Sequence, residues 1–450
     1  MRIHLIAIGG SAMHNMAIAL HKKGYQVTGS DDEIFEPSRE RLNKYGLLPE
    51  KMGWEASRIS SDIDVIILGM HARKDNPELL KAQELGLKIY SYPEYIYEQT
   101  KDKKRIVIGG SHGKTSMTAM TLHVLQNSGL DIDYLVGAQL DGFETMVKLS
   151  HKAEIVILEG DEYLSSPIDL RPKFHLYHPH IAVISGIAWD HINVFPTFDN
   201  YVEQFQIFAD KVEEGGTLIY FDEDENISNI GNSFKFNKIP YHAHPNKCID
   251  GVTYLLDEGK EYPLLIFGDH NLQNLNAALK ICISIGLSKE LFYEHIQSFK
   301  GAAKRLELVD KNDSCNVYKD FAHSPSKLKA TSSAVKKQFS SRKLVACMEL
   351  HTFSSLNEEF LKEYANTMDL PDEAYVYYNP ATIANKNIKP ITDTQVVKCF
   401  NRSDLVVFTD SKSLIKELKS KSWINTNLLL MSSGSFDGVD FNNLAKELLS

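Results

Sequence analysis

The sequence predicts an α/β protein built from three consecutive domains. Short apolar runs such as "IHLIAIGG", "VIILGM", "IVIGG" and "EIVILEGDE" alternate with segments of helical period, and turns containing glycine separate them. Strands that alternate with helices in this way are typical of parallel sheets covered by helices. The length of 450 residues is enough for roughly two to four domains, each with its own core.

The strand and helix alternation restarts twice along the chain. The first series ends at the charged stretch "EQTKDKKR" (98–105), and the second ends near "FKGAAKR" (299–305). The third contains the apolar runs "KLVACMEL", "EAYVYYNP" and "NLLLMSSG". We therefore predict domains at 1–101, 102–300 and 301–450. The first and third are expected to be Rossmann-like and the second to resemble a P-loop ATPase.

Composition excludes several classes of function. The net charge of −10 argues against a broad nucleic-acid surface. No apolar run reaches 18 residues, and the N-terminus lacks a signal-like apolar segment, so we expect a cytoplasmic protein without a membrane span. The five cysteines lack the paired spacing of a zinc site and are expected to be reduced thiols: Cys248, Cys282, Cys315, Cys347 and Cys399.

The first segment with the pattern of a nucleotide-binding turn is "IAIGGSAMHNM", a predicted strand followed by two glycines and then by a predicted helix. Such a turn brings backbone N–H groups to a diphosphate, and an acid some twenty residues later can bind a ribose. Gly9 and Gly10 are present and Asp31 is the acid, but the spacing is not G-x-G-x-x-G. The pattern alone leaves a nucleotide site and a plain tight turn equally open.

The second is "RIVIGGSHGKTSMTAM" (105–120), where a strand at 106–108 and a helix at 115–126 are predicted to flank the loop. The usual phosphate loop, G-x-x-x-x-G-K-[ST], requires a glycine at position 108, which is Ile108. The position between strand and helix nevertheless favours a phosphate site. Lys114 would reach phosphate oxygens and the Thr115 hydroxyl would reach Mg²⁺.

The third feature is a set of polar residues that follow later strands. Glu159 comes directly after the run "IVIL", and Asp190 and His191 follow "IAVISGIAW". Carboxyl ends of parallel strands share one edge of a sheet, so these groups are expected near the phosphate loop, where carboxylates can reach a metal ion. Each acid taken alone is more often a surface cap.

Together, six segments resemble the Mur ligase family, the ATP-dependent amide-forming enzymes of peptidoglycan assembly. They are "GSHGKTS" (110–116), "EGDEY" (159–163), "DH" (190–191), "GDHNLQNLNAA" (268–278), "AAKRLEL" (302–308) and "YKDFAHSP" (318–325). The family loop is the compact G-[TS]-x-G-K-[TS]-[TS], which has no glycine at the position of Ile108. The resemblance spans almost the whole chain, in order.

The resemblance implies roles for residues of all three domains. Lys114, Glu159, His191 and Arg305 would be catalytic, and Thr115, Glu159 and His191 would hold Mg²⁺. The first domain would bind UDP-N-acetylmuramate through Gly9, Gly10, Ser11, Ala12, Met13, Ser30, Asp31 and His71. ATP would be bound by Gly110, Ser111, His112, Gly113, Lys114, Thr115, Ser116, Asn271, Asn274, Arg305, Asp320 and His323.

The resemblance also implies the reaction. A substrate carboxylate attacks the γ-phosphate of ATP to give an acyl phosphate, and an amine then displaces phosphate. Residues 192–210 contain no lysine, so the chain resembles the branches that lack a carbamylated lysine. One such branch adds L-alanine, and another joins UDP-N-acetylmuramate to L-Ala-γ-D-Glu-meso-diaminopimelate in recycling. "EGDEYLSSPIDLRPKF" (159–174) favours the recycling branch, whereas "MELHTFSSLNEEF" (348–360) favours the alanine branch.

Two alternatives of other classes remain at this point. A non-catalytic nucleotide-binding regulator would keep the fold, although the intact set of Lys114, Thr115, Glu159 and His191 argues against it. A redox enzyme would use the N-terminal glycines for NAD(P) and leave the phosphate loop unexplained. The sequence does not distinguish a monomer from a homodimer, and "FHLYHPH" (174–180) is a weak metal pattern because its spacing is irregular.

Overall fold

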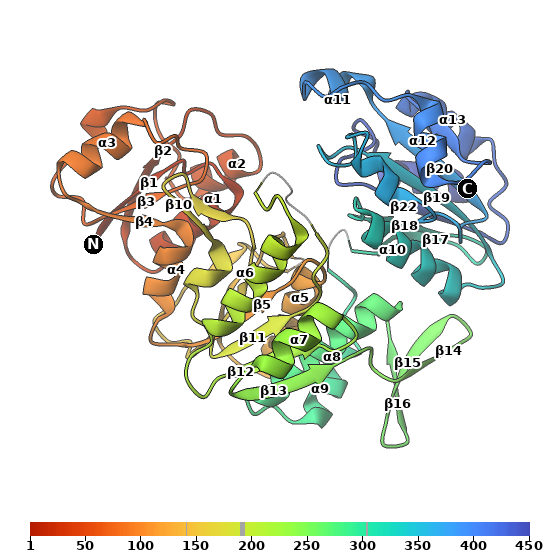
Figure 1. Ribbon diagram of the computed structural model, residues 1–450, viewed down its shortest axis with the longest axis horizontal. Helices are drawn as coiled ribbons and strands as arrows, with labels where there is room; N and C mark the ends of the chain where they lie inside the picture. The colour runs from red at the N-terminus through yellow and green to blue at the C-terminus, as the bar shows by residue number, and fades with distance from the viewer. Residues whose placement is uncertain (141, 190–193, 303–304) are drawn as a thin grey trace. The chain divides into compact units, whose positions relative to one another are not determined.

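The computed structural model (Figure 1) describes residues 1–140, 142–189, 194–302 and 305–450. These residues divide into two compact units. The first contains Met1–His242 and Asn274–Ile296, and the second contains Ala243–Gln273 and Gln297–Ser450. The predicted fold class, mixed α/β with mainly parallel sheets, is confirmed. The predicted domain boundaries near residues 101 and 300 stay a prediction. The division into two units does not test them, since the first unit includes both the four-stranded and the seven-stranded sheet, and residues 243–273 group with the C-terminal part.

The first sheet of unit 1 is parallel and has the strand order β2-β1-β3-β4. Its strands are β1 (Arg2–Ile6), β2 (Gln26–Ser30), β3 (Val65–Leu68) and β4 (Lys88–Ser91). The helices of this part are α1 (Ser11–Lys22), α2 (Ser38–Lys44), η1 (Ala56–Arg58), α3 (Pro77–Glu84) and α4 (Tyr92–Thr100). Every residue of β3 is buried, as expected for a strand covered on both faces.

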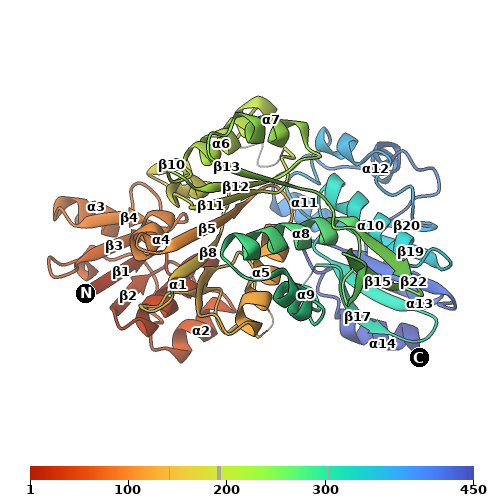
Figure 2. The same cartoon turned by 90° about the horizontal axis from the view of Figure 1, so that it is seen from below.

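The second sheet of unit 1 has the order β13-β12-β11-β5-β8-β6-β7, and β7 alone pairs antiparallel among the described strands. Figure 2 shows β11, β5 and β8 side by side. The strands are β5 (Lys104–Gly109), β6 (Ile132–Leu135), β7 (Val147–Lys148), β8 (Ile155–Glu159), β11 (Ile181–Ile184), β12 (Thr217–Phe221) and β13 (Asn237–Tyr241).

The remaining elements of this part include a small hairpin, β9 (Leu164–Ser166) and β10 (Asp169–Pro172), that follows β8. The helices are α5 (Lys114–Asn127), η2 (Lys173–Leu176), α6 (Phe198–Asp210), α7 (Glu225–Ser233) and α9 (Lys289–Ile296). Val107 and Leu158 share one hydrophobic cluster with Phe174 and with Phe205 of α6. This packing fixes the sheet, so the loops after β5 and β8 start from rigid strands.

Unit 2 contains a six-stranded sheet of order β17-β18-β22-β19-β20-β21, in which only the β17–β18 pair is antiparallel among the described pairs (Figure 1). The strands are β17 (Glu307–Lys311), β18 (Asn316–Asp320), β19 (Lys343–Leu350), β20 (Glu373–Tyr378), β21 (Val406–Phe408) and β22 (Thr426–Met431). Its helices are α10 (Pro325–Gln338), η3 (Phe360–Tyr364), α11 (Pro380–Asn385), α12 (Asp393–Phe400), α13 (Ser411–Lys419) and α14 (Phe441–Leu449).

A three-stranded antiparallel sheet also belongs to unit 2, with strands β14 (Asn246–Ile249), β15 (Val252–Asp257) and β16 (Lys260–Leu264). Helix α8 (Asp269–Ser284) contributes residues to both units. No helix in the described part of the chain is long and apolar enough to cross a membrane. The described cysteines are free thiols.

Candidate active site

The phosphate loop follows β5 and leads directly into α5. β5 ends at Gly109 and α5 begins at Lys114, so the predicted strand and helix are confirmed with slightly longer bounds. Gly113 has φ +76°, a left-handed conformation that favours glycine. The first N–H groups of a helix have no acceptor within the helix and lie at the positive end of its dipole. The loop therefore presents the geometry that holds a phosphate group.

The two described residues predicted to hold a metal ion lie in direct contact. The Thr115 hydroxyl donates to one Glu159 carboxylate oxygen at 2.8 Å, and the Gly137 N–H donates to the other at 2.7 Å. Glu159 ends β8, which pairs with β5, so the two loops share one sheet edge. A hydroxyl and a carboxylate are oxygen ligands of the kind that Mg²⁺ prefers, and the pair therefore fits such an ion.

Lys114 is held at the start of α5 by two acceptors. Its ammonium group donates to the Gly110 carbonyl at 2.6 Å and to Glu162 at 2.8 Å. Burial lowers the pKa of Lys114, but the negative charges of Glu162, Asp161 and Glu159 outweigh burial and raise it above its ordinary value. Lys114 is therefore a stable cation at the loop.

The two predicted asparagines belong to α8 and have different surroundings. Asn274 adjoins the loop, because a methyl group added to Gly113 would lie 2.0 Å from the Asn274 side-chain oxygen. Asn271 lies one helical turn earlier and donates its amide to the Phe267 carbonyl at 2.9 Å. Both side chains are buried. Asp190 and His191, the remaining predicted polar pair, lie outside the described residues.

The other loop residues are fixed by neighbouring backbone. The Ser111 hydroxyl accepts the Ala188 N–H at 2.9 Å and lies 3.0 Å from the Tyr201 hydroxyl. The Ser185 hydroxyl donates to the His112 carbonyl, and Ser116 is buried in the first turn of α5. The loop is thus pinned to the segment after β11. In the described part of the chain no three His, Cys, Asp or Glu side chains gather as a ready metal cluster.

The N-terminal glycine turn brings four of its predicted residues together. The Gly9 N–H donates to Asp31 at 2.7 Å, and a methyl group at Gly10 would lie 3.7 Å from the His71 ring. Burial raises the pKa of Asp31 to about 6, against the Gly9 hydrogen bond, which lowers it. The turn, the acid and His71 therefore form one edge at the carboxyl ends of β1, β2 and β3, where such sheets bind ligands.

The remaining residues predicted to bind the UDP substrate differ in solvent exposure. Ser11 and Ala12 are exposed at the start of α1, whereas Met13 is buried. The Ser30 hydroxyl is fully buried and donates to Glu78, so the fold itself uses that group. His14 is the fourth residue of α1. Its Nδ1 lies 3.0 Å from the Gly10 carbonyl, and burial lowers its pKa, so it buttresses the turn as a neutral ring.

The C-terminal residues predicted to contact ATP gather within unit 2. The Arg305 guanidinium lies over the Phe321 ring at 4.9 Å. Asp320 ends β18 and accepts the Leu306 N–H at 2.5 Å, and burial raises its pKa although Arg305 opposes the change. His323 Nδ1 lies 2.8 Å from the Phe321 carbonyl. Arg305, Asp320 and His323 thus come from one edge of the second unit's sheet.

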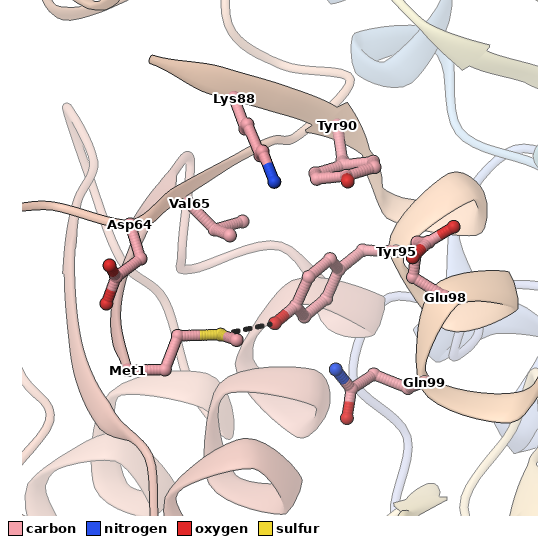
Figure 3. A pocket seen from close by; sticks show the side chains of 8 residues that line it. All are labelled: Met1, Asp64, Val65, Lys88, Tyr90, Tyr95, Glu98 and Gln99. Carbon is pink, nitrogen blue, oxygen red and sulfur yellow. Dashed lines mark hydrogen bonds between the residues drawn. The ribbon is translucent and has the colours of Figure 1, made fainter.

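One hollow lies at the end of the first sheet opposite to the glycine turn. It is lined at the amino ends of the first sheet by residues that include Met1, Asp64, Lys88 and Tyr95 (Figure 3). Met1 precedes β1 and Lys88 begins β4, whereas the glycine turn follows the end of β1. Parallel sheets bind nucleotides at the carboxyl ends of their strands, so this hollow is not the nucleotide site.

Sequence reasoning missed Glu162 and Tyr201. The side chain of Glu162 is 3% exposed and contacts Lys114, and the fully buried Tyr201 hydroxyl donates to its other oxygen at 3.2 Å. The only sequence signal was the third acid of "EGDEY", three residues after Glu159. Tyr201 carried no signal, because nothing local indicates that α6 turns its hydroxyl toward the loop.

A mainly parallel sheet with a phosphate loop, a lysine at the helix start and an adjoining acid is typical of nucleotide-dependent enzymes of the P-loop class. Comparison with known proteins then identifies the family. The Mur ligase middle domain matches residues 108–282, and the catalytic domain of the Mur ligase family matches residues 2–104.

Sequence relatives cover the chain almost completely. A UDP-N-acetylmuramate–L-alanine ligase of Sulfurihydrogenibium sp. is 29% identical over 460 residues, covering 99% of this chain and 98% of that protein. An enzyme of the same name from Caldicellulosiruptor saccharolyticus is 31% identical over 394 residues, covering 83% of each chain. The chain therefore belongs to the Mur ligase family, and it is an ATP-dependent, ADP-forming ligase.

Solved structures agree with this fold. MurC, the UDP-N-acetylmuramate–alanine ligase of Thermotoga maritima, has a TM-score of 0.70 at 21% identity, covering 100% of this chain and 98% of that one. The murein peptide ligase of Psychrobacter arcticus has a TM-score of 0.66 at 21% identity, with the same coverage. These identities show the fold alone. The ligase class is confirmed over the regulatory and redox alternatives by the family match.

Proposed function

We propose that this ligase joins the carboxylate of UDP-N-acetylmuramate to the amine of L-Ala-γ-D-Glu-meso-diaminopimelate in peptidoglycan recycling. The observation that carries the activation step is the contact of Thr115 with Glu159 beside Lys114, at the start of α5. This arrangement supplies one fixed cation and one pair of oxygen ligands next to a helix N-terminus. Phosphoryl transfer to a carboxylate requires that combination, because negative charge accumulates on the phosphate oxygens.

In the first step, an oxygen of the substrate carboxylate attacks the γ-phosphorus of ATP. The bond to the β,γ-bridging oxygen breaks, and ADP leaves with the electron pair. Lys114 and the first N–H groups of α5 stabilise the phosphate oxygens through this step. Thr115 and Glu159 would hold Mg²⁺, with His191 as the proposed ligand of a second ion, and bound Mg²⁺ would neutralise phosphate charge.

In the second step, the amine nitrogen attacks the acyl carbon of the acyl phosphate. The tetrahedral intermediate collapses to the amide, inorganic phosphate leaves, and the nitrogen loses a proton. Arg305, Asp320 and His323 are proposed to meet the nucleotide when the C-terminal domain closes on it, and Asn271 with Asn274 would recognise adenine. The gathering of Arg305, Asp320 and His323 at one sheet edge supports their common role.

UDP-N-acetylmuramate is proposed to bind at the glycine turn. The N-terminus of α1 would meet the diphosphate with Gly9, Gly10 and the exposed Ser11, and Asp31 would accept from a ribose hydroxyl. The contact of the Gly9 N–H with Asp31 and the closeness of His71 to Gly10 support one continuous site. The surroundings of Ser30 and Met13 favour a supporting role for these two residues.

The recycling substrate is supported by the segment after β8. The residues "EGDEYLSSPIDLRPKF" fold into the β9–β10 hairpin and η2, and this stretch is the one that resembles the recycling branch. A second candidate is addition of free L-alanine. It is favoured by the alanine-ligase relatives, which cover up to 99% of the chain, and by the segment 348–360. A cytoplasmic location without a membrane or nucleic-acid partner is part of the proposal.

The experiment is phosphate release from ATP with Mg²⁺ and UDP-N-acetylmuramate, compared between the tripeptide and free L-alanine. Tripeptide-dependent release, with the amide product identified by mass spectrometry, is the expected result. Release with L-alanine alone would replace the recycling assignment by the second candidate. Release with neither amine would reject both substrates while leaving the family membership unchanged.

A further inference from the structure

The mechanism gives no role to Glu162, an acid of the segment that follows β8. Glu162 is nearly buried, with a side chain that is 3% exposed, and it contacts Lys114 at 2.8 Å. A buried carboxylate next to the phosphate-binding cation is electrostatically expensive for a phosphate site, because two negative charges then compete for one ammonium group.

The Glu162 carboxylate is held from two sides. One oxygen accepts from Lys114, and the other accepts from the Tyr201 hydroxyl at 3.2 Å. The same hydroxyl lies 3.0 Å from Ser111, which belongs to the phosphate loop. A closed ring therefore runs from the loop through Ser111, Tyr201 and Glu162 to Lys114. Because α6 buries Tyr201 completely, the carboxylate is fixed in place rather than free to swing away.

The neighbouring acid has a different partner. Asp161 pairs with Lys173 at 2.5 Å, and Glu159 is occupied by Thr115 and Gly137. Each of the three acids of this strand end thus has its own contact, and Glu162 alone accepts a hydrogen bond from Lys114 among the described carboxylates. Glu162 is therefore the acid whose charge a phosphate at Lys114 would meet first.

We propose that Glu162 is a positioning residue that occupies Lys114 as an internal counter-ion and competes with the nucleotide phosphates for it. This inference rests on the proposed role of Lys114. Nucleotide binding exchanges the Glu162–Lys114 contact for a phosphate–Lys114 contact, while Tyr201 retains Glu162. Glu162 thereby fixes the orientation of the Lys114 side chain. It also weakens the binding of the nucleotide in the ground state. Binding energy saved in this way is available to the transition state.

The test is the dissociation constant of ADP with Mg²⁺, measured by isothermal titration calorimetry on the full chain. Glu162→Gln keeps the shape and removes the charge, and it is expected to tighten ADP binding roughly tenfold, since one nearby buried charge is worth at least that much. A gain in affinity is a readout that structural damage does not mimic. An unchanged or weaker affinity in Glu162→Gln would overturn the proposal.

Two further variants separate charge from packing. Tyr201→Phe removes the hydroxyl and keeps the Glu162 charge, so ADP affinity should stay within about twofold of the parent protein. Equal tightening in Tyr201→Phe and Glu162→Gln would contradict competition by charge. If Glu162→Gln does not fold, Glu162→Asp withdraws the charge by one methylene and should tighten binding by roughly twofold to fivefold. No tightening there would overturn the proposal as well.

Glu261→Gln is the matched control. Glu261 also pairs with a lysine, Lys247, at 2.6 Å, but on the exposed β14–β16 sheet. The ADP affinity of the Glu261→Gln variant should equal that of the parent protein. ADP binding needs neither the UDP substrate nor the amine, so failure of Glu162→Gln to bind more tightly rejects only this inference. Absence of ADP binding by the parent protein would reject the proposed nucleotide site itself.

Discussion

Two strand–loop–helix units of the first compact unit begin in the same way, one at Gly9 and Gly10 before α1 and the other at residues 110–113 before α5. Both aim the first N–H groups of a helix at a ligand. The first turn of α1 carries no acidic side chain, and the nearby acid, Asp31, accepts the Gly9 N–H. The second starts its helix with Lys114 and lies beside Glu159 and Glu162.

The difference shows how the same strand–turn–helix geometry can be suited either to ligand binding or to catalysis. A helix start without a cationic side chain, next to an acid that can bind a ribose, can orient a nucleotide, but it brings no positive side-chain charge to a reacting phosphate. The loop before α5 adds a cation and lies beside an acid, and in the proposed mechanism these groups stabilise charge that develops during phosphoryl transfer. The comparison therefore supports the proposed roles, recognition for the first turn and activation for the second.

The largest expected effect comes from removing Lys114, the cation that the loop before α5 has and the N-terminal glycine turn lacks. Lys114→Ala should lower ATP turnover by about a thousandfold or more, because the phosphate charge loses its fixed counter-ion in a partly dry site. Binding of UDP-N-acetylmuramate, measured by calorimetry, should stay unchanged since the glycine turn is intact. Near-parental turnover in Lys114→Ala would remove the proposed activation step.

The two glycines at the helix starts should respond differently to an added methyl group. Gly113→Ala places a β-carbon 2.0 Å from the Asn274 side chain at φ +76°, and it should cost roughly 2–4 kcal/mol of unfolding free energy through strain and displacement. Gly10 has φ −56°, and its nearest contact would be 3.6 Å, so Gly10→Ala should change stability by less than about 0.5 kcal/mol. Denaturant unfolding of both variants measures the difference, and equal losses would contradict it.

The smallest effect concerns the acid of the first turn. The pKa of Asp31 is raised from 3.8 to about 6 by burial, so the folded chain binds this proton more tightly than the unfolded chain. Its contribution to stability is therefore most favourable below about pH 4, falls as pH rises to about 6, and is constant above that value. The change is on the order of 1–3 kcal/mol.

Asp31→Asn provides the reference for that pH dependence, because an amide oxygen still accepts the Gly9 N–H and does not titrate. The difference in unfolding free energy between parent and variant should shift in favour of the variant between pH 4 and pH 6. A difference that is flat across this range would show that Asp31 is not perturbed by its site.

The elements that position both sites were predictable from sequence because they are local. The run "IVIGG" followed by "KTSMTAM" (114–120) specifies a strand, a turn and a helix within about twenty residues, and β5 and α5 lie where the pattern placed them. The adjacency of Lys114 and Thr115 likewise needs no tertiary information. Glu159 was predicted from its place after an apolar run, since the carboxyl ends of parallel strands meet at one edge.

The sequence by itself therefore determined the α/β class, the two glycine-containing turns and the family. Only the tertiary structure decided which acid contacts Lys114, which N–H group holds Glu159, and that Asn274 adjoins Gly113. Glu162 lies 48 residues from Lys114, and Tyr201 lies 39 residues from Glu162. Such pairings arise from strand order and helix packing, and no local pattern of residues encodes them.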